Sequence, residues 1–97
     1  MRVTESSWEN GSSTRYLRSE TERLERLEDY DDKGHLTMAV DYLYDDRGRN
    51  TERVVRKADG KQIRRLTFEF QDSMKGAIHR EYDENDKLLF TRIAEDA

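Results

Sequence analysis

The chain has 97 residues, of which 41% are charged and 33% hydrophobic, and its formal net charge is −4. This length suits one domain with a thin core, which we place over residues 1–97. The absence of Cys excludes disulfides and thiolate zinc sites. Acidic and basic residues are interleaved and the pI is near 5.2, which argues against nucleic acid as a partner.

The distribution of apolar residues argues against two further classes, membrane-spanning proteins and disordered chains. No segment is long and apolar enough for a membrane helix, and residues 1–13 lack the apolar run of a signal peptide, so we expect a cytoplasmic protein. The high charge approaches the composition of disordered chains. Five Tyr, three Phe and one Trp, with short runs of Val, Ile and Leu, favour folding instead.

The first third of the chain predicts a hairpin followed by an ambiguous segment. Asn10 and Gly11 form a strong hairpin signal, so residues 2–8 and 14–18 are predicted to pair as strands. In residues 19–29, Ser19 and Glu22 resemble a helix capping box, so a short helix is one option. An outer strand with period-two alternation from Leu24 is the other option, and we favour it because a neighbouring sheet edge would be present.

An Asp-containing turn then recurs. The segment 30–36, YDDKGHL, returns as 44–50, YDDRGRN, and more loosely as 82–88, YDENDKL. Asp bonds its own backbone two residues on, and Gly, Asn or Asp later in the turn tolerates left-handed backbone. Aligning these copies with two shorter turns gives steps of 11 to 14 residues, typical of a meander. The aspartates used for this alignment are Asp31, Asp45, Asp59, Asp72 and Asp83.

The segments between these turns are predicted to be strands. Their ranges are 36–44, 50–58, 62–70, 77–82 and 88–94. Apolar residues alternate with polar ones in several of them, which indicates one apolar and one charged face. The fold class is therefore all-β or mainly β: an antiparallel meander of about seven or eight short strands, forming a curved single sheet or a small up-and-down barrel.

The turn segments resemble two families of bacterial hairpin repeats. Residues 81–88 and 58–61 look like turns of MORN-type variant repeats, and the copies at Tyr30 and Tyr44 look like the YD repeats of Rhs-type proteins. The resemblance covers roughly residues 30–89. It implies stacked hairpins that act as a binding platform or shell, without catalytic residues.

No constellation of reactive side chains is evident in the sequence. His35 falls in a predicted turn and His79 on the predicted polar face of a strand, so both are interpreted as surface residues. The acidic pairs of the turns would be solvated and ionised, which does not suit a glycosidase acid. We therefore expect no enzymatic activity, no catalytic residue, no metal and no cofactor.

The leading functional hypothesis is a protein-binding module, such as a bacterial antitoxin, an immunity protein or a phage-encoded inhibitor. Acidic turns would meet a protein partner with a basic surface. Trp8 and Tyr30 are the aromatic interface candidates, because such rings often anchor interfaces. The acidic candidates are Asp31, Asp32, Asp45, Asp46, Asp83 and Glu84.

Two alternatives stay open at this stage. A closed barrel of about eight strands could hold an apolar small ligand. A sheet with one uncovered apolar face could instead associate with itself as a structural protein or a homodimer. Neither alternative involves a nucleic acid or a membrane.

Overall fold

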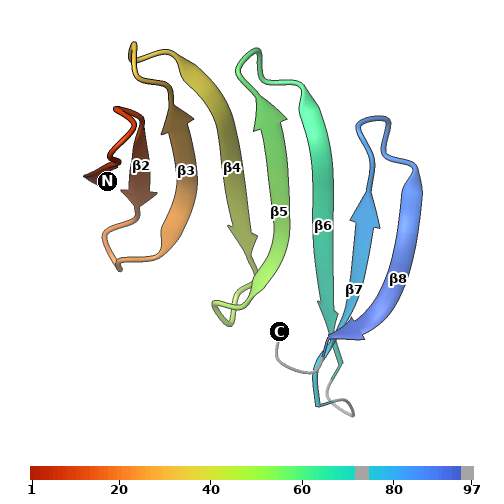
Figure 1. The fold of residues 1–97 in the computed structure, drawn as a ribbon. Helices are drawn as coiled ribbons and strands as arrows, with labels where there is room; N and C mark the ends of the chain where they lie inside the picture. Colours follow the sequence, from red (N-terminus) through yellow and green to blue (C-terminus); the bar gives the residue numbers. More distant parts are fainter. Residues whose placement is uncertain (72–74, 95–97) are drawn as a thin grey trace.

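The computed structural model describes residues 1–71 and 75–94 and shows one antiparallel sheet (Figure 1). Its eight strands are hydrogen-bonded in sequence order, and no helix occurs among the described residues. Nothing in that part of the chain could therefore cross a bilayer as a long apolar helix. The strands are β1 Arg2–Ser7, β2 Ser13–Arg18, β3 Leu24–Tyr30, β4 Leu36–Tyr44, β5 Asn50–Lys57, β6 Gln62–Phe70, β7 Ala77–Tyr82 and β8 Leu88–Ala94.

The predicted meander is confirmed, and of its two forms the open sheet is the one observed. β1 and β8 lie at opposite edges, so the described strands do not close into an up-and-down barrel. The short helix considered for residues 19–29 is absent. Glu22 has a φ of 67°, which no right-handed helix accommodates, and Ser19 Oγ accepts the N–H of Arg23 to close a turn. The preferred strand interpretation of this segment is confirmed by β3.

Six of the turns are built in the same way. In the turn after β3, the Asp31 N–H donates to the carbonyl of His35 at 2.9 Å, and the Gly34 N–H donates to the carbonyl of Asp31 at 3.1 Å. The fourth turn residue has a positive φ, 81° at Gly34, where Gly lacks a Cβ to strain the backbone. The equivalent pair of bonds is made by the turns that begin at Trp8, Ser19, Asp31, Asp45, Lys57 and Asp83.

The structure corrects the alignment of Asp59 with the other aspartates. Asp59 is the third residue of its turn, which begins at Lys57, whereas Asp31 and Asp83 are first residues. Asp72 lies outside the described residues. In five hairpins the pairing register also shifts just before the turn, as it does between Asp29 and Tyr30. The repeat is therefore a turn with an adjoining register shift, and aspartate is one of several residues that can open it.

The pairing register assigns side chains to two faces. Leu27, Val40 and Val55 are aligned across β3, β4 and β5, so they share one face. Val55 pairs with Arg64 of β6, so Phe68, four residues further along β6, also lies on this face. Phe68 is paired with His79, which places His79 on the same face. The expectation that His79 is a surface residue on the polar face is wrong, because the mixed alternation of β7 does not fix its orientation and the pairing with β6 does.

The opposite side, here called the charged face, carries an ion-pair network. Asp41 accepts bonds from Arg26 at 2.8 Å and from Arg56 at 2.9 Å. Ala39 and Val54 lie on the same side of the sheet as these groups and are buried. Long charged side chains thus cover small apolar ones, because their methylene stems shield apolar surface while the charges reach water.

Candidate binding surface

The other side of the sheet, here called the aromatic face, carries an extended set of rings. Register pairing places Tyr42 beside Arg53 and Leu66, and Phe68 lies two residues along β6 from Leu66. No second layer packs on this face among the described residues, since each strand contacts only its neighbours in the sheet. The rings that define the face are those of Tyr16, Tyr42, Phe68, Phe70 and Phe90.

Arginine side chains lie over these rings. The Arg53 guanidinium carbon is 5.3 Å from the ring centroid of Phe68 and 5.6 Å from that of Tyr42. Arg49 lies 4.6 Å from the centroid of Phe70. Such cation–π contacts are favourable by roughly 0.5–1 kcal/mol at exposed sites. Arginine side chains therefore accompany the rings of the aromatic face, although the whole chain is acidic.

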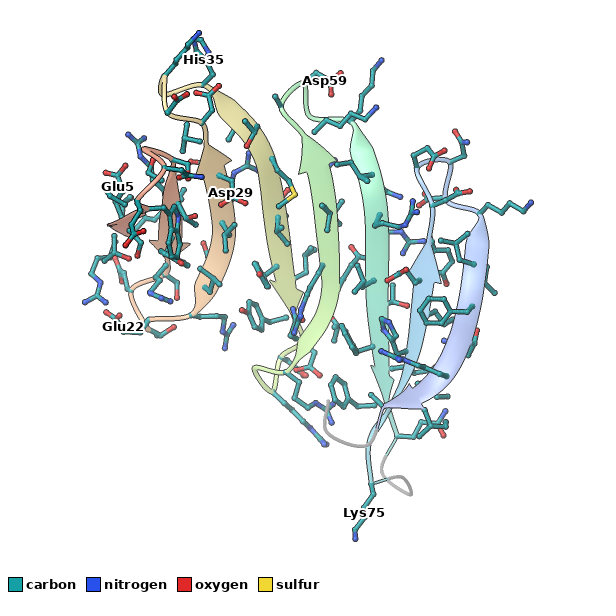
Figure 2. The ribbon with its side chains drawn as sticks, viewed as in Figure 1. Glu5, Glu22, Asp29, His35, Asp59 and Lys75 are labelled. Carbon is teal, nitrogen blue, oxygen red and sulfur yellow. The ribbon has the colours of Figure 1, made fainter. Side chains whose placement is uncertain are left out.

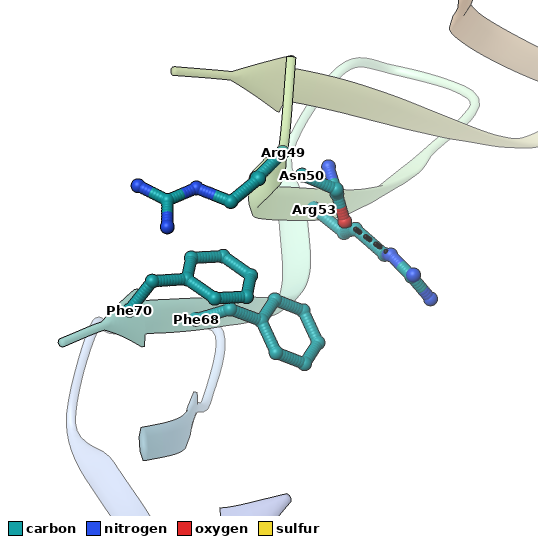
Figure 3. A pocket seen from close by; sticks show the side chains of 5 residues that line it. All are labelled: Arg49, Asn50, Arg53, Phe68 and Phe70. Atoms are coloured by element: carbon teal, nitrogen blue, oxygen red, sulfur yellow. Dashed lines mark hydrogen bonds between the residues drawn. The ribbon is translucent and has the colours of Figure 1, made fainter. Parts of the chain in front are cut away.

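A cavity of about 320 Å³ opens between two of these arginines and two rings. Figure 3 shows Arg49 and Phe70 on one side of it and Arg53 and Phe68 on the other. Arg49 ends the turn between β4 and β5, Asn50 and Arg53 belong to β5, and the two rings project from β6. The volume is near the lower end of the range for small-ligand pockets.

Both guanidinium groups are held through their Nε atoms. Arg53 Nε donates to Asn50 Oδ1 at 2.7 Å, and Arg49 Nε donates to Asp45 Oδ2 at 2.8 Å. Asn50 is itself fixed, because its Nδ2 donates to the carbonyl of Leu43 at 2.8 Å. Within the described ranges, Arg53 has no carboxylate at ion-pair distance. The arrangement suits a ligand group that combines a negative charge with an apolar or aromatic body.

His79 lies beside this site and is only 3% exposed. Its ring stacks on Phe68 with centroids 4.8 Å apart, and Phe90 approaches edge-on at 5.6 Å. Its Nδ1 is buried and has no hydrogen-bond partner. A buried polar atom without a partner destabilises the folded state.

Replacing His79 with phenylalanine is therefore expected to raise the free energy of unfolding by about 1 kcal/mol. The new ring would keep the stack with Phe68 and remove the orphaned nitrogen. Urea unfolding followed by circular dichroism measures the change. A loss of stability in this variant would show that the imidazole makes a necessary polar contact.

Three of the acidic residues predicted to meet a partner are used by their own turns. The carboxylates of Asp31, Asp45 and Asp83 each accept backbone N–H bonds from the second and fourth residues that follow, at 2.8–3.0 Å. The backbone bonds from His35, Arg49 and Lys87 are the chief causes that lower the pKa of the respective carboxyl groups. These aspartates shape the hairpins.

The other acidic candidates are exposed but are not gathered into one patch. Asp32 and Glu84 lie in turns at one end of the sheet, and Asp46 lies at the other end. Figure 2 shows the two ends by their labelled residues, with His35 and Asp59 at one and Glu22 and Lys75 at the other. The predicted acidic surface is thus divided between the two ends.

The two aromatic candidates lie on opposite faces. Trp8 is half-exposed, and its Nε1 donates to Thr14 Oγ1, which in turn donates to Asp29. Tyr30 instead donates from its hydroxyl to Glu28 at 2.8 Å. Since successive residues of a strand point to opposite sides, the contacts to 28 and 29 separate the two rings. Trp8 and Tyr30 therefore do not form a single contact site for a partner.

The sequence did not single out the residues of the cavity. Phe68 and Phe70 are visible as an alternating pair in the sequence, but their arginine neighbours come from another strand. The signal that could have found the site is the sequence RNTER at 49–53, which follows the repeated turn and brings two arginines toward the next strand. This signal identifies the site only when the pairing register between β5 and β6 is known.

The fold and this surface together define an open, single-layer β-meander with an arginine-lined aromatic face. No group of three metal-binding side chains occurs among residues 1–71 and 75–94. Comparisons with protein-family models, curated proteins and solved structures gave no match to this chain.

Proposed function

We propose that this protein is a non-enzymatic protein-binding module that meets its partner on the aromatic face. The observation that carries the proposal is the cavity between Arg49, Arg53, Phe68 and Phe70 on a sheet face without a covering layer among the described residues. Uncovered apolar surface of this kind is a common feature of interaction sites. Aromatic rings and arginine are also the side chains most often found as interface anchors.

The charges of the cavity favour an acidic segment of a partner protein. The terminal amino groups of Arg49 and Arg53 can donate to a carboxylate while a neighbouring apolar side chain of the partner contacts the phenylalanine rings. Binding of a basic partner by the turns stays a prediction, for which the exposed Asp32, Asp46 and Glu84 are the available residues. The cavity would thus bind an acidic partner, whereas the turns would bind a basic one.

A role as an antitoxin, immunity protein or inhibitor is compatible with such a module, because each works by occupying a partner surface. The alternative of an apolar ligand held inside a closed barrel loses its structural basis, because β1 and β8 are open edges. The alternative of a self-associating sheet depends on a different part of the molecule, the β8 edge.

A defined peptide pair tests the proposal. One synthetic peptide alternates glutamate with phenylalanine, and the other alternates lysine with phenylalanine. We expect the glutamate peptide to bind and to shift the side-chain Nε–H signals of Arg49 and Arg53 in NMR titrations. Arg53→Ala should weaken its binding about tenfold, as expected when a charged hydrogen bond is lost.

Arg80→Ala is the matched control, because Arg80 lies on the charged face and contacts Glu69 at 3.4 Å. It should leave the affinity for the glutamate peptide unchanged. Tighter binding of the lysine peptide, with signal shifts at Asp32, Asp46 and Glu84, would contradict the acidic-partner proposal and support a basic partner.

A further inference from the structure

Strand β8 is an open edge of the sheet and is unusually apolar. It is the last strand in the sheet order and pairs only with β7 among the described strands. One row of its backbone N–H and C=O groups is therefore available to another strand. Four of its large side chains are exposed: Leu88 by 49%, Leu89 by 45%, Phe90 by 39% and Ile93 by 57%.

The opposite edge is protected in the manner usual for soluble sheets. β1 carries Arg2 and Glu5 on a six-residue strand, and its other residues are mostly small and polar. Arg2 pairs with Glu22, and Arg15 of β2 lies near Glu5. Charges on an edge strand discourage pairing with another chain. β8 has Arg92 as its only charged residue, so the two edges differ in kind.

We propose that two copies of this chain pair antiparallel through β8 and thereby join their sheets into one. A two-fold axis beside Thr91 would set Phe90 opposite Arg92 of the second copy. It would also set Leu89 opposite Ile93 of the second copy. The strand that pairs with β8 is thus β8 of the second copy.

The chemistry of β8 is complementary to itself in this register. On the aromatic face each Arg92 would lie beside a phenylalanine ring of the other copy, and within one chain Arg92 already lies 5.7 Å from the Phe90 centroid. On the charged face Leu89 and Ile93 would cover each other, and no like charges stand directly opposite. Every pair formed by residues 89–93 is favourable or neutral.

The chemistry of the two edges favours a closed dimer over an open filament. Head-to-tail pairing of β8 with β1 would set apolar side chains against Arg2 and Glu5 and would leave free edges at both ends. Pairing of β8 with β8 uses up the apolar edge and leaves only the charged β1 edges outside. The interface is one strand wide, at the small end of specific interfaces, so we expect micromolar dissociation.

Sedimentation equilibrium of the purified chain over a dilution series tests this proposal. We expect a monomer–dimer equilibrium, and Ile93→Lys should raise the dissociation constant at least about tenfold, because it places an ammonium group against Leu89 of the second copy. Val3→Lys is the matched control, since Val3 is 55% exposed on the other edge. It should dimerise like the unaltered chain.

A second experiment tests the register. Leu89→Glu and Ile93→Lys chains should each be monomeric alone. When mixed they should form a heterodimer, because the introduced carboxylate of one chain then faces the introduced ammonium group of the other across the axis. Circular dichroism confirms that each variant is folded. The proposal is overturned if the unaltered chain is monomeric at every concentration, or if Val3→Lys dissociates the dimer as strongly as Ile93→Lys. It is also overturned if mixing the Leu89→Glu and Ile93→Lys chains forms no heterodimer.

Discussion

Replacing Asp41 with alanine is expected to lower the free energy of unfolding by about 2 kcal/mol. The carboxylate bridges Arg26 and Arg56 on the charged face, with Val54 as its partner on the neighbouring strand. Removing it leaves two guanidinium groups close together without their shared anion. A change of this size should shift the thermal midpoint downward by roughly 10 °C in a domain of this length, as calorimetry would measure.

Glu69→Ala is the control for Asp41→Ala, because the Glu69 carboxylate is 52% exposed and contacts Arg80 at 3.4 Å. Exposed pairs contribute little, so this variant should change stability by less than about 0.5 kcal/mol. If both variants lose the same free energy of unfolding, the partly buried position of Asp41 does not make its ion pairs more stabilising than exposed ones.

The same carboxylate predicts a pH dependence. Burial alone would raise the pKa of Asp41, but the hydrogen bonds from Arg56 and Arg26 outweigh burial and hold its pKa below the ordinary value. Its contribution to stability is therefore present above the unfolded-state pKa of about 3.9 and is lost as the pH falls through the lower folded-state pKa. The Asp41→Ala variant should show a shallower loss of stability below pH 4 than the unaltered chain.

Replacing Gly34 with valine should destabilise the protein by about 2 kcal/mol through backbone strain alone. Gly34 has a φ of 81°, and a Cβ placed there meets no atom within 4 Å, so the Cβ itself is not crowded. A β-branched residue tolerates this left-handed backbone poorly. Denaturant unfolding should show a lower midpoint with an unchanged slope.

Lys33→Val is the matched control, because it adds the same side chain one residue earlier, where φ is not positive. Its effect should stay within about 0.5 kcal/mol, as is usual for exposed positions. If both valine variants lose the same stability, the cost comes from an exposed valine in the turn and the explanation from φ fails.

Much of the fold was predictable because turn chemistry and period-two alternation are local signals. The predicted ranges 36–44, 62–70, 77–82 and 88–94 coincide with β4, β6, β7 and β8. The turn at 19–23 was the hardest, since its left-handed residue is Glu22, a residue type that gives no hint of positive φ. The helix alternative arose from the resemblance of Ser19 and Glu22 to a capping box.

The candidate site was much less predictable because it depends on which residues of neighbouring strands stand side by side. Arg53 reaches Phe68 only because β5 and β6 pair with Arg53 opposite Leu66. A shift of one residue would turn Phe68 to the charged face. The orientation of His79 was mistaken for the same reason, since the alternation of β7 leaves either choice and the pairing with Phe68 decides it.

The sequential strand order has a consequence for how the chain folds. Every strand contact in the described residues joins neighbours along the chain, so no hairpin has to wait for a distant segment. Contacts that are this local usually go with rapid folding. During synthesis on the ribosome, each hairpin can therefore add to the ones already formed as soon as it emerges.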